Sequence, residues 1–147
     1  TPNMISEALQ PILEDETVSI VNLMGEISDL DEFEDPNTVK VVVGLDGNAI
    51  YFSREPIPSR KKGFADVPMR KQICVIPFRR EYLLEFNQTP ETPLEVIESV
   101  DMLRIIESGG RVKMVMTSGE SYGVDTVADL EKVTERMTND PLMARYV

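Results

Sequence analysis

The residues best suited to chemistry stand close to the end of the chain, in the run Gly123-Val124-Asp125-Thr126. A helix-like segment, 127–137, follows directly, so the run predicts a tight loop between a strand and a helix. A carboxylate on such a loop is well placed to hold a metal ion beside a phosphate group. Asp125 is therefore the first candidate for a catalytic residue and metal ligand. Its alternative role is to help Thr126 cap the helix.

The chain contains no histidine. This excludes serine-histidine and cysteine-histidine catalysis, and it excludes a histidine-based zinc site. Carboxylates, lysines and arginines remain, and the cation that suits them is a hard one such as Mg²⁺. The single cysteine, Cys74, lies in the apolar run 73–76 and has no partner for an internal disulfide. We therefore expect a small, buried side chain at Cys74.

The chain of 147 residues carries a formal net charge of -11 and has a pI near 4.4. Such an acidic surface argues against binding to a nucleic acid or to an anionic membrane. No apolar run approaches the roughly 18 residues that span a bilayer, and no signal peptide opens the chain, so we expect a cytoplasmic protein. The length fits a single domain, 1–147, that buries about 70% of the surface of its unfolded form.

Helix-like and strand-like segments alternate along the chain and must position these residues. Apolar periodicity distinguishes the two kinds of segment. The expected helices cover 2–14, 81–86, 92–108 and 127–137, and the expected strands cover 18–24, 37–43, 49–54, 72–78 and 111–116. Helices interleaved with strands predict an α/β fold in which helices pack on a mixed sheet.

The connections between these segments have their own signatures. A turn around Asp46-Gly47 joins 37–43 to 49–54 and predicts an antiparallel β-hairpin. The acidic stretch 26–35 is expected to be a solvated loop. The segment 55–68 is rich in proline, lysine and arginine, which predicts a mobile loop that either faces an anion or is simply solvated.

Two helices begin with the capping-box pattern, at Thr92 with Glu95 and at Thr126 with Asp129. In the first, apolar side chains cover most of the circumference, so we expect one well-buried helix that ends at Gly109-Gly110. In the second, apolar residues at helical spacing predict a face that packs inward: Leu130, Val133 and Met137.

Three segments, taken in order, resemble one known family. They are the hairpin region 36–58, which contains Tyr51-Phe52-Ser53-Arg54, the helix start 92–99, and the loop and helix of 123–131. Together they resemble the 3-deoxy-manno-octulosonate cytidylyltransferases, also called CMP-Kdo synthetases, over nearly the whole chain. The resemblance implies part of a nucleotide-diphospho-sugar transferase fold, which is Rossmann-like.

The activity that this resemblance implies is transfer of CMP from CTP to an acidic 2-keto sugar such as Kdo, with release of pyrophosphate. Mg²⁺ assists the reaction, which serves lipopolysaccharide biosynthesis. Metals and cationic side chains stabilise the phosphate charge in such a transfer, so the lack of histidine is compatible with it. The resemblance also implies a carboxy-terminal portion that lacks the amino-terminal CTP-binding segment, and we expect this chain to be inactive alone.

The resemblance implies roles for individual residues. Asp125 matches the metal-binding aspartate of the Gly-Val-Asp-Thr motif. Arg54 and Ser53 resemble positions near the sugar, where the arginine pairs with a carboxylate through two hydrogen bonds; alternatively, Arg54 is an ordinary surface arginine. Lys40 either neutralises substrate charge or lies on the solvent face of its strand. Glu95 either faces the sugar or serves only the capping box.

Two departures from the family pattern leave the sugar open. The Kdo-specific pattern has a histidine near the position of Gln72 and a glutamine near that of Val96. Gln72 can still hydrogen-bond to sugar hydroxyls but cannot become charged, and the side chain of Val96 forms no hydrogen bond. The candidate substrates are therefore Kdo, an amino-substituted Kdo and a sialic-acid-like sugar.

The resemblance further implies a homodimer, formed partly by residues 49–58. The competing hypothesis is a noncatalytic interaction module. It would be an acidic α/β domain that binds a partner through the hairpin and the basic loop 55–68.

Overall fold

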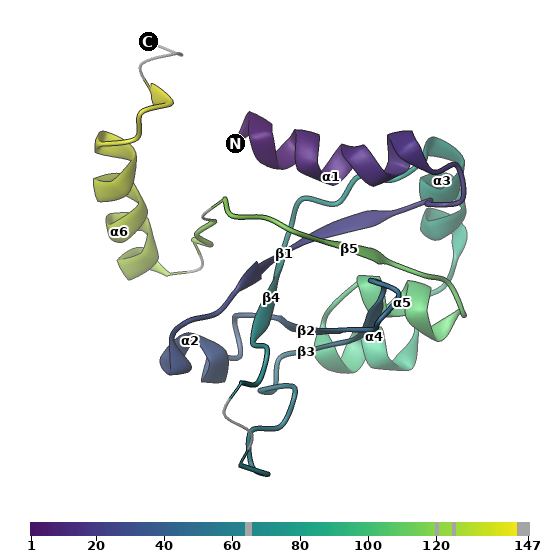
Figure 1. Ribbon diagram of the computed structural model, residues 1–147, viewed down its shortest axis with the longest axis horizontal. Coiled ribbons are helices and arrows are strands. Elements are labelled where there is room, and N and C mark those ends of the chain that lie inside the picture. Colours follow the sequence, from purple (N-terminus) through teal and green to yellow (C-terminus); the bar gives the residue numbers. More distant parts are fainter. Residues whose placement is uncertain (64–65, 120, 125, 144–147) are drawn as a thin grey trace.

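The computed structural model describes residues 1–63, 66–119, 121–124 and 126–143. These residues form a five-stranded mixed sheet with helices packed against it (Figure 1). The predicted α/β fold is therefore confirmed. The candidate metal ligand Asp125 lies outside the described residues.

The strands are β1 (Val21–Glu26), β2 (Lys40–Val43), β3 (Ala49–Ser53), β4 (Arg70–Ile73) and β5 (Lys113–Met116). The helices are α1 (Pro2–Glu14), α2 (Leu30–Glu34), α3 (Arg80–Gln88), α4 (Pro93–Glu98), α5 (Met102–Glu107) and α6 (Val127–Thr138). The strands lie in the order β3-β2-β4-β1-β5. Only β1 and β5 are parallel among these pairs; β1 with β4, β4 with β2 and β2 with β3 are antiparallel.

The predicted hairpin is formed by β2 and β3, with Lys40 opposite Ser53. Gly47 has a φ of 77°, a left-handed conformation that glycine adopts without a steric penalty. The Asp46 carboxylate accepts a hydrogen bond from the backbone N–H of Asn48 at 3.0 Å, which closes the turn. The tip of the hairpin then reaches β5, because the N–H of Met114 donates to the carbonyl of Gly47.

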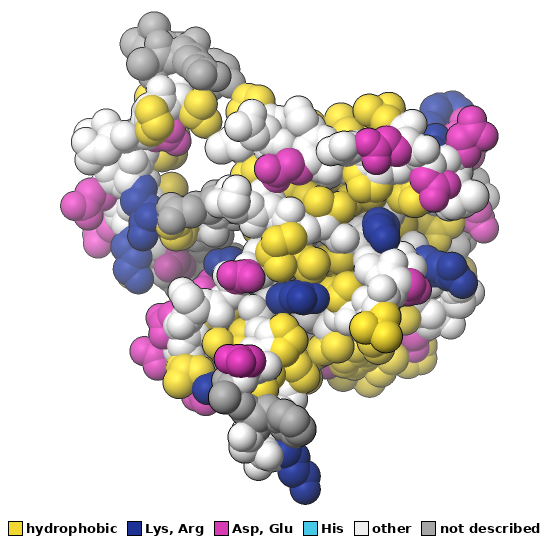
Figure 2. All heavy atoms as spheres, viewed as in Figure 1, with side chains coloured by type: hydrophobic (Ala, Val, Ile, Leu, Met, Phe, Trp, Pro, Cys, Tyr) yellow, Lys and Arg dark blue, Asp and Glu magenta, His cyan; other side chains and the backbone are white. Residues whose placement is uncertain are grey.

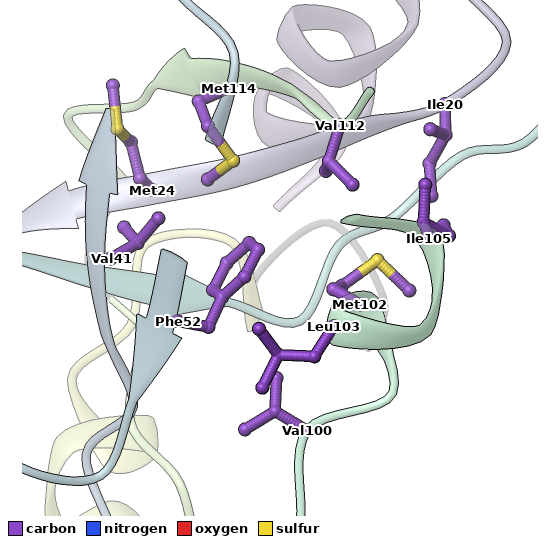
Figure 3. Close-up of a cluster of buried hydrophobic side chains, with 10 residues drawn as sticks. All are labelled: Ile20, Met24, Val41, Phe52, Val100, Met102, Leu103, Ile105, Val112 and Met114. Carbon is purple, nitrogen blue, oxygen red and sulfur yellow. The ribbon is translucent and has the colours of Figure 1, made fainter. Parts of the chain in front are cut away.

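Two apolar clusters lie on opposite faces of the sheet. Successive residues of β1 point to opposite faces, so Leu23 packs against α1 while Met24 belongs to the other cluster. The larger cluster joins β1, β2, β3 and β5 to α5, and Figure 3 shows its side chains converging: Ile20, Met24, Val41, Phe52, Val100, Met102, Leu103, Ile105, Val112 and Met114. The smaller one holds α1 to the sheet.

The single helix predicted for 92–108 is wrong, because the structure divides it into α4 and α5. Ser99 caps α4 in the left-handed region, at a φ of 53°, and this redirects the chain before α5 begins. Apolar residues on α5 are buried, whereas Val96 and Ile97 on α4 are mostly exposed. The apolar residues around the circumference therefore belong to two short helices with different surroundings.

The acidic stretch 26–35 is not simply a loop, because it contains α2. The Asp29 carboxylate caps this helix by accepting a hydrogen bond from the N–H of Asp31 at 3.0 Å. Phe33 is buried and anchors the helix to the body of the protein. The charges around it remain on the surface, as the sequence predicts.

The strand predicted for 72–78 is regular only as far as Ile73. Leu23 stands opposite Ile73, so a regular ladder would place Ile20 opposite Ile76; instead Ile20 pairs with Phe78. Two extra residues are therefore accommodated in an irregularity of the β-bulge kind. Cys74 lies in this irregularity and is exposed, so its predicted burial is wrong.

The last helix, α6, forms where it was predicted, and Thr126 and Asp129 make the expected capping box. Its predicted inward face is wrong for the described residues. No residue of α6 is buried, and both Leu130 and Met137 are exposed. Figure 1 shows α6 standing apart from the layers formed by α1 and the sheet.

Candidate functional site

A broad groove of about 1490 Å³ lies at the edge of the sheet where the parallel strands β1 and β5 end. Gly25 and Glu26 line it from β1, and Met116 and Thr117 line it from the end of β5. Open α/β sheets commonly bind ligands at the carboxyl ends of their strands, because loops diverge there and leave a crevice. The location alone therefore makes this groove the candidate functional site.

The far wall of the groove comes from α6 and the residues before it, including Tyr122 and Arg136. Figure 2 shows basic side chains on the α6 region, at the left. The Arg136 guanidinium donates to the hydroxyl of Tyr122 at 2.6 Å and lies 4.0 Å from the centre of its ring. This contact ties α6 to the segment that precedes it.

Both signs of charge line the groove. Its basic side chains are Arg54, Lys71, Lys132 and Arg136, and its acidic ones are Glu26, Asp29, Asp31, Glu32, Asp35, Asp101 and Asp129. The Lys71 ammonium already pairs with the Glu32 carboxylate at 2.5 Å. An anionic ligand in this groove therefore needs its own local cations, because the lining as a whole is acidic.

Arg54 lines the groove at the end of β3, and the structure ties it to the backbone. Its guanidinium donates to the carbonyls of Glu98, Pro36 and Ser99 at 2.6, 2.9 and 3.2 Å. Arg54 is therefore not an ordinary free surface arginine. A guanidinium has five N–H donors, so one remains on each terminal nitrogen, which leaves room for the predicted contact with a carboxylate.

Ser53 is buried beside Arg54, and both residues bind Glu98, which the sequence did not identify. The Ser53 hydroxyl donates to Glu98 Oε1, and the Arg54 N–H donates to Oε2, each at 2.8 Å. Partial burial alone would raise the pKa of Glu98, but these hydrogen bonds and one from Tyr51 outweigh it and lower the pKa below its ordinary value. Glu98 thus holds the end of β3 against α4 as a carboxylate.

Lys40 lies inside the protein, with 0% of its surface exposed, so the predicted solvent-face alternative is wrong. Its ammonium donates to the carbonyl of Asp35 at 2.9 Å and also to the carbonyl of Arg54. Desolvation lowers its pKa from the ordinary value, while nearby carboxylates oppose that shift. Lys40 does not line the groove. Its position supports a structural role, in which its ammonium holds together the segments that contain Asp35 and Arg54.

Glu95 is buried between α4 and α5 and does not line the groove. The Arg104 guanidinium donates two hydrogen bonds to its carboxylate, from Nη2 to Oε1 at 2.5 Å and from Nε to Oε2 at 2.7 Å. The same carboxylate accepts from the N–H of Thr92 at 3.2 Å, as the capping box requires. These contacts engage both carboxylate oxygens of Glu95 and support its capping role.

Gln72, a predicted sugar-binding residue, lies on β4 and lines the groove. Its amide nitrogen donates to Oδ1 of the buried Asn22 at 2.7 Å. Asp101 and Cys74 line the same groove. Of the predicted site residues that the structure describes, Gln72 and Arg54 thus line the groove. Ser53, Lys40 and Glu95 do not line it.

The predicted metal site depends on Asp125, which the structure does not describe. Elsewhere in the described ranges, no group of three or more metal-ligating side chains comes together. Asp129, which lines the groove, already accepts from the N–H and hydroxyl of Thr126 at 3.0 and 2.7 Å.

Among the described residues, no helix is long and apolar enough to cross a membrane.

Comparison with known proteins shows what this chain is similar to. Residues 1–120 match the model of a family described as "Cytidylyltransferase". Among curated relatives, the 3-deoxy-manno-octulosonate cytidylyltransferase of Geotalea uraniireducens (strain Rf4) is 42% identical over 146 residues, which cover 92% of this chain and 58% of the relative. The enzyme of the same name from Geobacter metallireducens is 38% identical, over 93% of this chain and 58% of its own length.

The structural comparison agrees with the sequence comparison. A solved CMP:2-keto-3-deoxy-manno-octonic acid synthetase, complexed with CTP, superposes with a TM-score of 0.85 at 33% identity. The match covers 93% of this chain and 56% of that protein. The chain therefore spans a little over half the length of the proteins that it matches.

Proposed function

This chain belongs to the cytidylyltransferase family, and from that membership we propose that the protein transfers CMP from CTP to Kdo or a Kdo-like acidic 2-keto sugar. The observation that carries the proposal is the similarity, along 93% of the chain, to a synthetase solved with CTP. Pyrophosphate is the second product. The family membership argues against a noncatalytic interaction module.

In the proposed reaction, the anomeric hydroxyl oxygen of the sugar forms a bond to the α-phosphorus of CTP. The bond from that phosphorus to the oxygen bridging to the β-phosphate breaks, pyrophosphate leaves with the electron pair, and the hydroxyl proton passes to solvent. Charge on the phosphate oxygens must be stabilised throughout. Among groove residues, the remaining N–H groups of Arg54 are suited to hold the sugar carboxylate in place.

We further propose that Mg²⁺ assists the reaction and that Asp125 is one of its ligands. A hard divalent cation would neutralise charge on the triphosphate, and a carboxylate is the ligand that it prefers. The described residues contain no cluster of three or more metal-ligating side chains, so the proposal for the metal depends on Asp125.

One observation favours a second candidate substrate, an amino-substituted Kdo. Asp101 lines the groove that Gln72 also lines, so the groove offers both a carboxylate and a neutral amide. A carboxylate pairs more strongly with an ammonium group than with a hydroxyl. None of the described residues that line the groove specifically favours a sialic-acid-like sugar, which serves as a comparison substrate.

A direct test incubates the full-length protein with CTP, Mg²⁺ and one acid at a time: Kdo, an amino-substituted Kdo, or sialic acid. Pyrophosphate release is measured by a coupled assay, and the CMP-sugar is identified by mass spectrometry. We expect turnover with a Kdo-type acid and none with CTP alone. Failure of all three acids to release pyrophosphate would overturn the proposal.

The 147-residue chain by itself provides the matched control, and we expect no CMP-sugar from it. It spans 58% of the length of the relatives, so an active chain would have to hold CTP with just over half of their residues. Pyrophosphate release from CTP and Kdo by the isolated chain would contradict this expectation.

A further inference from the structure

Asn22 is a fully buried polar residue in β1, beside the irregularity that interrupts β4. Its side-chain nitrogen donates to the carbonyls of Leu23 and Ile73 at 2.7 and 2.8 Å. Both partners are carbonyl oxygens, which only accept hydrogen bonds. The side-chain atom facing them must therefore be Nδ2, and the orientation of the Asn22 amide is fixed.

The fixed orientation of Asn22 determines the orientation of Gln72. Asn22 Oδ1 can only accept, so the Gln72 atom that lies 2.7 Å from it must be the amide nitrogen Nε2. The Gln72 oxygen, Oε1, is then on the other side of its amide and accepts no hydrogen bond from the described residues. Gln72 is half-buried and lines the groove.

We propose that Asn22 is a positioning residue for the candidate substrate groove, which orients Gln72 so that its amide oxygen faces the groove as a hydrogen-bond acceptor. The inference rests on the proposed function. It predicts that the Gln72 amide oxygen accepts a hydrogen bond from the sugar acid, whose donor is either a hydroxyl or an ammonium group. Without Asn22, the Gln72 amide could turn over and offer its nitrogen instead.

The irregularity in β4 explains why a buried asparagine belongs at this place. A regular antiparallel ladder would supply backbone donors to successive carbonyls, but the two extra residues after Ile73 disturb that pattern. The Ile73 carbonyl accepts from the N–H of Val75 at 2.7 Å and from Asn22. Asn22 therefore stabilises the irregular backbone and orients a groove residue with the same side chain.

The kinetic test is a double-mutant cycle in the full-length protein: wild type, Asn22→Val, Gln72→Met and the double variant. We expect Asn22→Val to raise KM for the sugar acid about tenfold, the equivalent of one lost hydrogen bond, while kcat stays within about twofold. In the Gln72→Met background, Asn22→Val should leave KM unchanged, because the residue on which it acts is gone. KM for CTP serves as the internal control and should not change.

The outcomes separate this inference from the proposed function. A wild-type protein that releases no pyrophosphate with any acid would overturn the proposed function and the inference with it. An active wild type whose KM is unmoved by Asn22→Val, or moved equally in both backgrounds, would overturn the inference alone. An effect on thermal stability without a change in KM would show that Asn22 only supports the backbone.

A measurement on the wild-type chain keeps the inference testable if Asn22→Val does not fold. In ¹⁵N-labelled protein, the side-chain amide protons of Gln72 should exchange with solvent at least about tenfold more slowly than those of the exposed Gln88, because one of them is held by a buried acceptor. Equal exchange rates for the two glutamines would contradict the orientation assigned to Gln72.

Discussion

Arg104 and Glu95 form a buried ion pair that joins α5 to α4. Arg104→Met would leave the Glu95 carboxylate buried without its cation, so we expect the free energy of unfolding to fall by about 3–5 kcal/mol. Urea denaturation followed by circular dichroism measures this change. Arg80→Met is the matched control, because Arg80 and Glu81 are 79% and 82% exposed, and we expect a change within about 0.5 kcal/mol. Similar losses in both variants would contradict the assignment.

The same pair predicts a pH dependence of stability. Hydrogen bonds from Arg104 lower the pKa of Glu95 below its ordinary value of 4.5, and they outweigh the opposing effect of burial. A carboxylate with a lowered pKa in the folded state stabilises the fold above its unfolded pKa, and this contribution is lost as the pH falls below 4.5 toward the folded value. The unfolding free energy of wild type should therefore fall more steeply over that range than that of Glu95→Gln. Parallel curves for the two proteins would contradict this prediction.

Lys40 predicts a third effect at the residue scale. Lys40→Met would leave the carbonyls of Asp35 and Arg54 without their buried donor, and we expect a loss of about 2–4 kcal/mol of unfolding free energy. Lys113→Met is the control, because the Lys113 ammonium donates to one carbonyl, that of Asp46, in an exposed hydrogen bond. The control should lose less than about 1 kcal/mol, since water can replace that donor. A loss in Lys40→Met no larger than in the control would mean that water reaches the two carbonyls.

These residues show what a sequence can reveal about individual side chains. The hydrogen bond from the Thr92 N–H to Glu95 and the capping box at Thr126 were predictable, because capping depends on residues three positions apart. The partners of Glu98 were not, since they come together only when the end of β3 lies against α4. Nor was the contact of Lys40 with the Arg54 carbonyl, which depends on the register of β2 and β3. A lysine that alternates with valines in a strand predicts a solvent-facing side chain, and only the tertiary contacts show that Lys40 is buried.

At the scale of elements, the break between α4 and α5 depends on Ser99. Its φ of 53° is strained for a residue with a side chain and free of strain for glycine. Ser99→Gly should therefore raise the unfolding free energy by about 0.5–1 kcal/mol, which thermal or urea denaturation can measure. Ser108→Gly is the control, because Ser108 has a φ of -80° and gains nothing from glycine. Destabilisation by Ser99→Gly would mean that the serine side chain itself is needed there.

The types and order of the elements were largely predictable, because apolar periodicity is a local property. The sequence predicted both the hairpin and the final helix, and the structure contains them. It did not reveal the left-handed residue at Ser99 or the two extra residues after Ile73, since neither changes the apolar pattern. Periodicity also identifies an apolar face on α6 without identifying a surface that covers it.

At the scale of the whole molecule, the groove assembles residues that are far apart in the chain. Arg54 follows β3, Gln72 lies on β4 and Asp101 precedes α5, yet all three line it. The family resemblance indicated most of the predicted residues, but only the fold separates those that line the groove from those that support it. Long-range pairing of strands is the information that a single sequence lacks.

The hairpin carries the last prediction, which is a homodimer. β3 lies at the edge of the sheet, and Ile50 on it is 57% exposed. Edge strands with exposed apolar residues readily pair with a second copy. We expect light scattering at about 50 μM, a concentration at which even a weak interface associates, to give twice the chain mass of 16.6 kDa.

Ile50→Asp should shift the protein toward monomer, because it places a charge in the interface. Leu13→Asp, at a residue of α1 that is 80% exposed and remote from the hairpin in the sequence, should leave the dimer intact. A monomeric wild type would contradict the prediction, and loss of the dimer in Leu13→Asp alone would move the interface to α1.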